Sequence, residues 1–181
     1  ISVLLVTNNS EKALAQTLAG LVPAVVDGLL RRVIVVDQGS TDDTKLVAEG
    51  AGCAFYNEDN LSEAFRELRT HWLLLLRPGA TLQDEWIDAV GRHLAVSNSA
   101  ARFTLPQEAR SGLLGKLFTS KPSLNAGLLI KAETLRPFPS RLDELEDLPR
   151  QLKPVHYRLA FHFQIQQKAE PEGFAFLYVT G

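Results

Sequence analysis

The chain has 181 residues, 45% hydrophobic and 22% charged, which fits one compact domain with a core of ordinary size. Its 19 basic and 21 acidic residues give a formal net charge of −2, which argues against nucleic acid as a partner. A single cysteine, Cys53, excludes an internal disulfide and a cysteine-based metal cluster, so a reducing compartment fits best.

The most apolar run, residues 72–76, is far shorter than the roughly 20 residues that span a bilayer, so we expect a buried strand and no transmembrane segment. Together with the lone cysteine, this predicts a cytoplasmic protein, either free or peripheral at the inner face of a membrane. The sequence leaves the oligomeric state open.

In the first half of the chain, short apolar runs alternate with stretches of helical spacing. A first helix begins after the capping residue Ser10 and should break at Pro23. The capping-box pattern of residues 81–84 predicts the start of a further helix, with an apolar stripe from Leu82 to Leu94. The expected strands are residues 1–6, 33–36, 54–56 and 72–76, and the other expected helices are residues 41–50 and 61–68.

The second half is less regular. Its patterns predict strands at residues 102–105, 126–130, 157–165 and 174–179, the last two joined as a hairpin by the turn at residues 171–173. A basic helix is expected at residues 109–118, and an acidic helix at residues 142–152 that is interrupted near Pro149.

Regular alternation of strand and helix predicts an α/β fold with a mainly parallel, doubly wound sheet flanked by helices. Ligands of such sheets bind at the carboxyl ends of the strands. These ends are the loops at residues 7–9, 37–40 and 77–79. Asp37, the turn residue Gly39 and the capping residue Ser40 would together place a carboxylate and backbone N–H groups around a nucleotide-sized pocket.

Two segments carry a family resemblance. Residues 35–44, Val-Val-Asp-Gln-Gly-Ser-Thr-Asp-Asp-Thr, resemble the signature of the family 2 glycosyltransferases, in which Asp stands at the position of Gln38. Residues 1–9 look like the first strand of that family, and residues 145–148, Leu-Glu-Asp-Leu, are weakly similar to its acidic catalytic pair. The resemblance covers residues 1–152, strongly in the first half and loosely in the second.

The resemblance implies a single GT-A domain over residues 1–181, with a nucleotide-binding half (1–98) and an acceptor-side half with a C-terminal tail (99–181). It implies transfer of a sugar, with inversion, from a nucleotide-sugar donor to a hydroxyl of an unknown glycan, lipid or small-molecule acceptor. Asp147 would be the general base, with Asp143 as the fallback. The nucleotide-binding residues would be Thr7, Asn9, Asp37, Gln38 and Gly39.

The chain departs from the family where the fourth strand ends. Family members have Asp-x-Asp or a relative there, which holds Mg²⁺ or Mn²⁺ against the donor diphosphate, whereas this chain has Arg77, Pro78 and Gly79. A divalent metal is therefore not expected at the usual position. Arg77 either neutralises the diphosphate through bidentate hydrogen bonds or is a solvated turn residue.

Two other classes of function compete with a metal-independent transferase. A non-catalytic GT-A-like module would bind a nucleotide, a glycan or a protein without turnover, and the loss of the metal carboxylates favours it. A sugar nucleotidyltransferase ranks last, because residues 7–11 lack the glycine-rich basic loop of those enzymes. The four histidines show no metal-ligand spacing.

Overall fold

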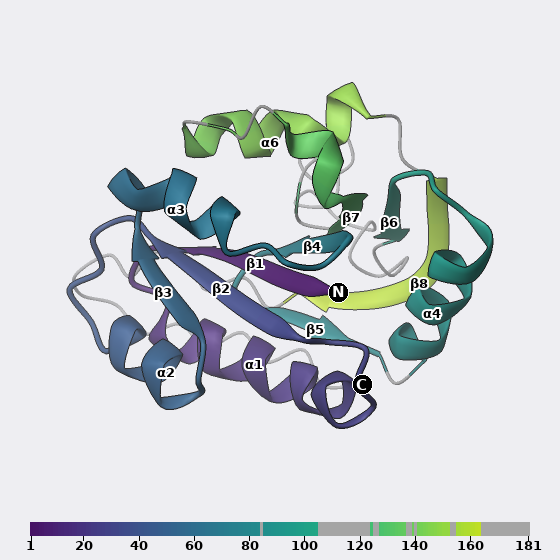
Figure 1. The fold of residues 1–181 in the computed structure, drawn as a ribbon. Coiled ribbons are helices and arrows are strands. Elements are labelled where there is room, and N and C mark those ends of the chain that lie inside the picture. The colour runs from purple at the N-terminus through teal and green to yellow at the C-terminus, as the bar shows by residue number, and fades with distance from the viewer. Residues whose placement is uncertain are drawn as a thin grey trace, which may run out of the picture.

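The computed structural model describes residues 1–83, 85–104, 124, 127–136, 139, 141–152 and 155–163. Within these residues the strands form one mixed sheet, in the order β3-β2-β1-β4-β7-β6-β8-β5 (Figure 1). The strands are β1 (Ser2–Thr7), β2 (Arg32–Asp37), β3 (Ala54–Asn57), β4 (Trp72–Leu76), β5 (Ala80–Leu82), β6 (Ala101–Thr104), β7 (Leu128–Lys131) and β8 (Val155–Phe163).

The first four strands in this order run parallel, and β6 and β8 are also parallel, so the expected mainly parallel α/β sheet is confirmed. The described pairs β4–β7, β6–β7 and β5–β8 are antiparallel. Thr7 pairs with Asp37, Asp37 with Asn57, and Leu5 with Leu76, so the carboxyl ends of four strands lie at one edge. We call this the carboxyl edge.

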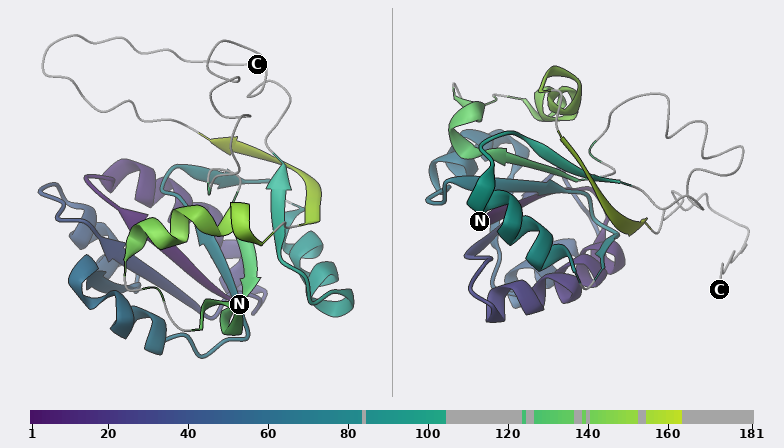
Figure 2. Two further views of the ribbon diagram at one scale, coloured as in Figure 1. Left: turned by 90° about the horizontal axis from the view of Figure 1, so that it is seen from above. Right: turned by 90° about the vertical axis from the view of Figure 1, so that its right-hand side faces the viewer.

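Helices cover both faces of the sheet, as Figures 1 and 2 show from three directions. Helices α1, α2 and α4 pack on one face, and α3 and α6 on the other. Among the described residues, no helix is both long and apolar enough to cross a membrane. The helices are α1 (Glu11–Val26), α2 (Thr44–Gly50), α3 (Leu61–Arg66), α4 (Trp86–Val96) and α6 (Leu142–Gln151), with short 3₁₀ helices at Glu58–Asn60 and Ala132–Leu135.

The central strands are buried on both sides, which explains their nearly continuous apolar sequences. In β1, Val3 and Leu5 face the cluster under α1, while Leu4 joins the cluster under α3 and α6. In β4, Leu74 and Leu73 divide in the same way. This two-residue alternation fixes the register, because a slip of one residue would exchange the two cores.

Two expected interruptions of helices are wrong. Helix α1 continues through Pro23 to Val26, and α6 continues through Pro149 to Gln151. Buried residues flank both prolines: Leu21 and Ala24 are 1% and 0% exposed in α1, and Leu148 is 8% exposed in α6. Packing of these side chains on the core therefore outweighs the local cost of a proline in each helix.

The capping box expected at residues 81–84 is also wrong. Thr81 and Leu82 belong to β5 and pair with His162 and Phe161 of β8. Helix α4 begins at Trp86, so Leu82 is not in the helix, although it packs in the same core cluster. The expected helix at 109–118 and strand at 174–179 lie outside the described residues.

Candidate functional site

The loops after β1 and β2 are joined through the buried side chain of Asp37. The Thr7 hydroxyl donates to Asp37 Oδ1 at 2.7 Å, and the Ser40 hydroxyl donates to the same oxygen at 2.5 Å. The Ser40 N–H donates to Oδ2 at 2.7 Å. Thr7 and Asp37 are only 1% and 5% exposed, so their hydrogen bond joins the two loops beneath the surface of the carboxyl edge.

Asn9 makes a second set of contacts between the same loops. Its N–H donates to Ser40 Oγ at 2.7 Å, and its Oδ1 accepts from the Thr41 N–H at 2.8 Å. The neighbouring Asn8 donates through Nδ2 to the Gln38 carbonyl at 2.9 Å. Asn9 has a φ of 46°, a left-handed conformation that asparagine tolerates better than most residues. This explains an asparagine at this turn independently of any ligand.

The N-termini of α1 and α2 are tied to each other by Asp42 and Thr44. Asp42 accepts from the Thr44 hydroxyl at 2.5 Å and from the Glu11 N–H at 3.1 Å, and Thr44 Oγ1 accepts from the Ser10 N–H at 2.8 Å. Burial alone would raise the pKa of Asp42, but the hydrogen bonds from Thr44 and Glu11 lower it below its ordinary value.

Neither serine caps a helix as expected from the sequence. Ser10 occupies the N-cap position of α1, but its hydroxyl donates to the Asn8 carbonyl at 3.0 Å rather than accepting from the helix. The N-cap of α2 is Asp43, three residues beyond Ser40. The Ser40 hydroxyl therefore serves the contact between the loops, whereas the Ser10 hydroxyl bonds within its own loop.

The exposed residues of this edge include Asn9, Gln38 and Gly39. Gly39 has a φ of 77°, which an L side chain rarely adopts, so the turn requires glycine. The Gln38 side chain donates through Nε2 to Glu58 Oε2 at 3.2 Å. Because its amide N–H₂ group points at Glu58, the Oε1 atom is left as the acceptor of this side chain.

The turn between β4 and β5 carries Arg77 and Gly79 at the same edge. Gly79 has a φ of 89°, and its N–H lies 3.0 Å from the Ala13 carbonyl and 2.9 Å from Thr17 Oγ1, so the turn is fastened to α1. Arg77 directly follows β4, two strands from Asp37. At the usual strand spacing their backbones lie about 10 Å apart, within reach of one diphosphate-containing ligand.

Asp147 and Asp143, the expected base and its fallback, are exposed on α6. Asp147 Oδ1 accepts from Arg150 Nη1 at 2.8 Å, and Asp143 Oδ2 forms an ion pair with Arg141 at 2.8 Å. Each carboxylate thus forms an ion pair with an arginine close in sequence. The role of Asp147 or Asp143 at the site stays a prediction.

Sequence reasoning missed Glu58 and Thr44 as parts of this edge. Glu58 follows β3, whose Asn57 pairs with Asp37, so the rule that carboxyl ends of parallel strands meet would have found it. Thr44 lies within the family signature but carried no assigned role. Its contacts with Ser10 and Asp42 show that part of this signature builds the loop itself.

With this geometry established, comparison with solved structures gives the class: the chain has the GT-A fold of nucleotide-sugar glycosyltransferases. The similar structures include glucosyl-3-phosphoglycerate synthase from Mycobacterium tuberculosis with Mn²⁺, UDP and glucosyl-3-phosphoglycerate. It matches with a TM-score of 0.66 and 18% identity over 92% of this chain and 72% of that one. The same enzyme with Mn²⁺ and UDP-glucose matches with a TM-score of 0.64 and 17% identity, over 92% and 71% of the two chains.

No family model matches the sequence, and no curated protein does. The structural likeness therefore establishes the fold, while the activity has to be argued from the residues at the carboxyl edge.

Proposed function

We propose that this chain is a glycosyltransferase of the family 2 type, which binds a nucleotide-sugar at the carboxyl edge and transfers the sugar to an acceptor hydroxyl. The main support for the proposal is the set of hydrogen bonds that Asp37 accepts from Thr7 and Ser40, which connect the loops after β1 and β2. It presents Gln38 and Gly39 to solvent at the edge where nucleotides bind in this class of sheet.

Gln38 is the proposed contact with the base of the nucleotide. Its Nε2 donates to Glu58, so Oε1 is the atom that accepts from a ring N–H. Uracil and guanine both present such an N–H, whereas the Watson–Crick edges of adenine and cytosine lack one and present an exocyclic amine instead. An exocyclic amine can also donate to Oε1, so a uridine or guanosine diphosphate sugar as the donor is a proposal that nucleotide titration tests.

Arg77 is the proposed partner of the diphosphate. In the transfer step, a base removes the proton of the acceptor hydroxyl, whose oxygen bonds to the anomeric carbon while the bond to the diphosphate breaks. The electron pair leaves with the nucleoside diphosphate, and a guanidinium can stabilise its charge through two parallel hydrogen bonds. Attack opposite to the leaving group inverts the anomeric centre. Asp147 is the proposed base.

The donor atoms at the end of β4 do not suit a metal ion, although the similar structures contain Mn²⁺. Arg77 is a cation, and the Gly79 N–H faces acceptors on α1. Among the described residues, no three His, Cys, Asp or Glu side chains gather into a metal-binding group. We therefore propose transfer that proceeds without a resident metal, with Arg77 supplying positive charge.

Calorimetric titration of the intact chain with UDP, GDP, ADP and CDP tests the binding step. We expect UDP or GDP to bind most tightly, and Gln38→Ala to reduce the preference over ADP by about tenfold, the value of one hydrogen bond. Glu85→Ala, at an exposed position before α4, is the control. Absence of binding by all four nucleotides would contradict the proposal.

A non-catalytic nucleotide-binding module is the second candidate, favoured by the ion pair that engages Asp147. Hydrolysis of the donor sugar, followed in the absence of an acceptor, distinguishes the two functions. A transferase releases free sugar slowly and loses this activity in Asp147→Asn, with UDP or GDP affinity unchanged. Binding without any turnover in either protein would favour the module.

A further inference from the structure

We propose a second ligand site, for a small phosphomonoester, in a basic cavity at the opposite edge of the sheet from the proposed nucleotide site. The cavity has a volume of about 560 Å³, and Arg69, Lys131 and Arg136 line it. We call it the basic cavity. The proposal does not depend on the proposed transferase activity.

Three segments that are distant in sequence meet at this cavity. Leu68 to His71 precede β4, Lys131 ends the antiparallel neighbour β7, and Asn98 lies between α4 and β6. Trp72, the first residue of β4, pairs with Lys131, so the cavity lies at the amino end of β4. Arg77 follows the other end of the same strand, about 15 Å away along a strand of this length.

The charges that line the cavity favour an anion. Three permanent cations, Arg69, Lys131 and Arg136, face a single carboxylate among the described lining residues, that of Glu133. Lys131 Nζ lies 3.6 Å from Glu133 Oε1, but the Glu133 side chain is 74% exposed and that of Lys131 only 28%. The Glu133 carboxylate thus sits at the exposed rim, and the Lys131 side chain is the more buried of the two.

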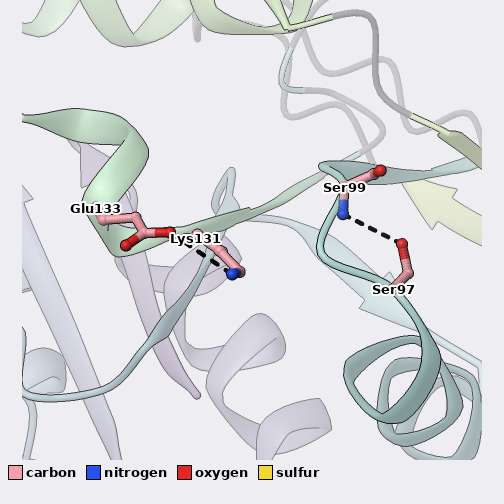
Figure 3. A network of polar contacts seen from close by, with 4 residues as sticks. All are labelled: Ser97, Ser99, Lys131 and Glu133. Carbon is pink, nitrogen blue, oxygen red and sulfur yellow. Dashed lines mark hydrogen bonds and ion pairs between the residues drawn. The ribbon is translucent and has the colours of Figure 1, made fainter.

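The walls of the cavity are held by hydrogen bonds before any ligand binds. The Ala132 N–H donates to the His71 carbonyl at 2.9 Å, which joins two of the segments. His93 Nε2 lies 2.7 Å from the Ser99 carbonyl, and the Ser99 N–H donates to Ser97 Oγ at 3.1 Å. Figure 3 shows the contact of Ser99 with Ser97 after α4 and, apart from it, Lys131 beside Glu133.

The size and polarity of the cavity define the ligand class. Its volume falls within the range of about 300–1,000 Å³ that is usual for small-molecule sites. A phosphomonoester carries a charge of about −1.5 to −2 at neutral pH, which suits a cavity lined by Arg69 and Lys131. The negative net charge of the whole chain disfavours a polyanion such as nucleic acid, which needs a broad basic surface.

Calorimetric titration of the full chain with glycerol 3-phosphate, with glycerol as the uncharged control, tests the proposal. We expect binding of glycerol 3-phosphate alone, weakened about tenfold in Arg69→Gln and in Lys131→Gln, the effect of one charged hydrogen bond. Arg66→Gln, an exposed arginine of α3 outside the cavity, is the matched control and should bind normally.

Glu133→Gln gives the sharper test, because its expected effect has the opposite sign. Removal of the rim carboxylate should tighten glycerol 3-phosphate about threefold, which an unspecific loss of folding cannot do. Thermal melting confirms that each variant is folded. The proposal is overturned if Arg77→Gln weakens the binding and Arg69→Gln does not, since the anion then occupies the carboxyl edge.

Two further outcomes would also overturn it. One is the absence of glycerol 3-phosphate binding at concentrations up to about 10 mM. A dissociation constant above this value would be too weak for a specific small-molecule site. The other is binding only to phosphatidylcholine vesicles that contain phosphatidic acid, because the same phosphomonoester would then be recognised as a lipid headgroup at a membrane. Binding of the free phosphomonoester that is unchanged by added vesicles supports the proposal.

Discussion

Asp37 shows how firmly a residue at a candidate ligand site is tied to the protein itself. The residue is 5% exposed, and its carboxylate accepts from the hydroxyls of Thr7 and Ser40 and from the Ser40 N–H. Hydrogen bonds to a charged, buried group are stronger than neutral ones, and removal of the acceptor leaves these donors unsatisfied. A ligand-facing role therefore comes in addition to a structural one.

We expect Asp37→Ala to lower the free energy of unfolding by about 2–4 kcal/mol, the sum of a lost charged hydrogen bond and unsatisfied buried donors. Urea denaturation measures this change. The control is Asp59→Ala, at an exposed position, which should change stability by less than about 0.5 kcal/mol. If both variants are equally stable, Asp37 does not hold the loops together.

A substitution of Arg77 distinguishes the contribution of the diphosphate to the binding affinity from that of the base. In Arg77→Ala, the affinity for UDP should fall by about 1.5–3 kcal/mol, the usual value of a charged hydrogen bond, while uridine should bind as before. Titration calorimetry with both ligands measures the difference. Equal losses for UDP and uridine would show that Arg77 acts through the fold of the β4–β5 turn.

Cys53 provides a pH-dependent test of packing at a half-buried position. Burial raises the pKa of its thiol from 9.0 to about 11, so the folded state favours the neutral form. This contribution to stability is complete below pH 9 and is lost as the pH rises through 11. Alkylation by iodoacetamide should be slow at pH 8 in the folded protein and fast in urea. Equal rates would contradict the burial.

Among the elements, the central strands were the easiest to predict. Residues 33–36 and 72–76 are apolar runs whose alternate residues enter two cores, a pattern that few other structures require. The helix through Pro23 could not be predicted locally, because its stability comes from Leu21 and Ala24 in the core. Strand β5 was missed because its partner, β8, lies about 80 residues further along the chain.

In the candidate site, too, some features could be predicted from the sequence and others could not. Asp37 and Gly39 follow from a strand that ends in a tight turn, and a single sequence suffices to place them at the carboxyl edge. The contacts of Asn9 with Ser40 and Thr41 join residues about 30 positions apart and depend on the register of β1 and β2. Periodicity and spacing contain no information on such contacts.

The contact between the β4–β5 turn and α1 can be tested by its contribution to stability. Gly79 has a φ of 89°, so Gly79→Ala should lower the free energy of unfolding by about 1–3 kcal/mol. Thr17→Val removes one of the two acceptors of the Gly79 N–H and should cost about 1 kcal/mol, whereas Thr17→Ser retains the acceptor.

The control for Gly79→Ala is Gly50→Ala. Gly50 ends α2, and a Cβ added there would meet nothing within 4 Å. Alanine in a helical position should be neutral or stabilising by up to about 1 kcal/mol. Thermal denaturation of the two variants compares them directly. Equal effects would mean that the backbone of the β4–β5 turn is not strained by a side chain.

For the molecule as a whole, the sheet separates two proposed sites at opposite ends of β4. Glycerol 3-phosphate and UDP should therefore bind independently unless the sheet itself changes between two arrangements. The side chains of the central strands are packed on both faces of the sheet, which favours a rigid connection between the two ends of β4. Arg69 and Arg77 are accordingly expected to act on different ligands.

The last prediction concerns the metal, and it depends on all the acceptors at the carboxyl edge together. The Asp37 oxygens accept from Thr7 and Ser40, Asp42 accepts from Thr44 and Glu11, and Glu58 accepts from Gln38. Beyond these, the described end of β4 has a guanidinium and no carboxylate. Binding of Mg²⁺ or Mn²⁺ requires several oxygen ligands, which this edge would have to withdraw from existing hydrogen bonds.

The affinity for UDP should therefore change by less than about threefold when EDTA replaces Mn²⁺ in a calorimetric titration. Arg77→Asp supplies the opposite case: it should bind UDP poorly in EDTA and recover affinity with Mn²⁺, because a carboxylate at the end of β4 can hold the ion against the diphosphate. An enhancement of about tenfold or more by Mn²⁺ in the unmodified chain would contradict the metal-free proposal. The ion would then be held by carboxylates of the chain away from the end of β4, and Arg77→Asp would add little to an effect already present.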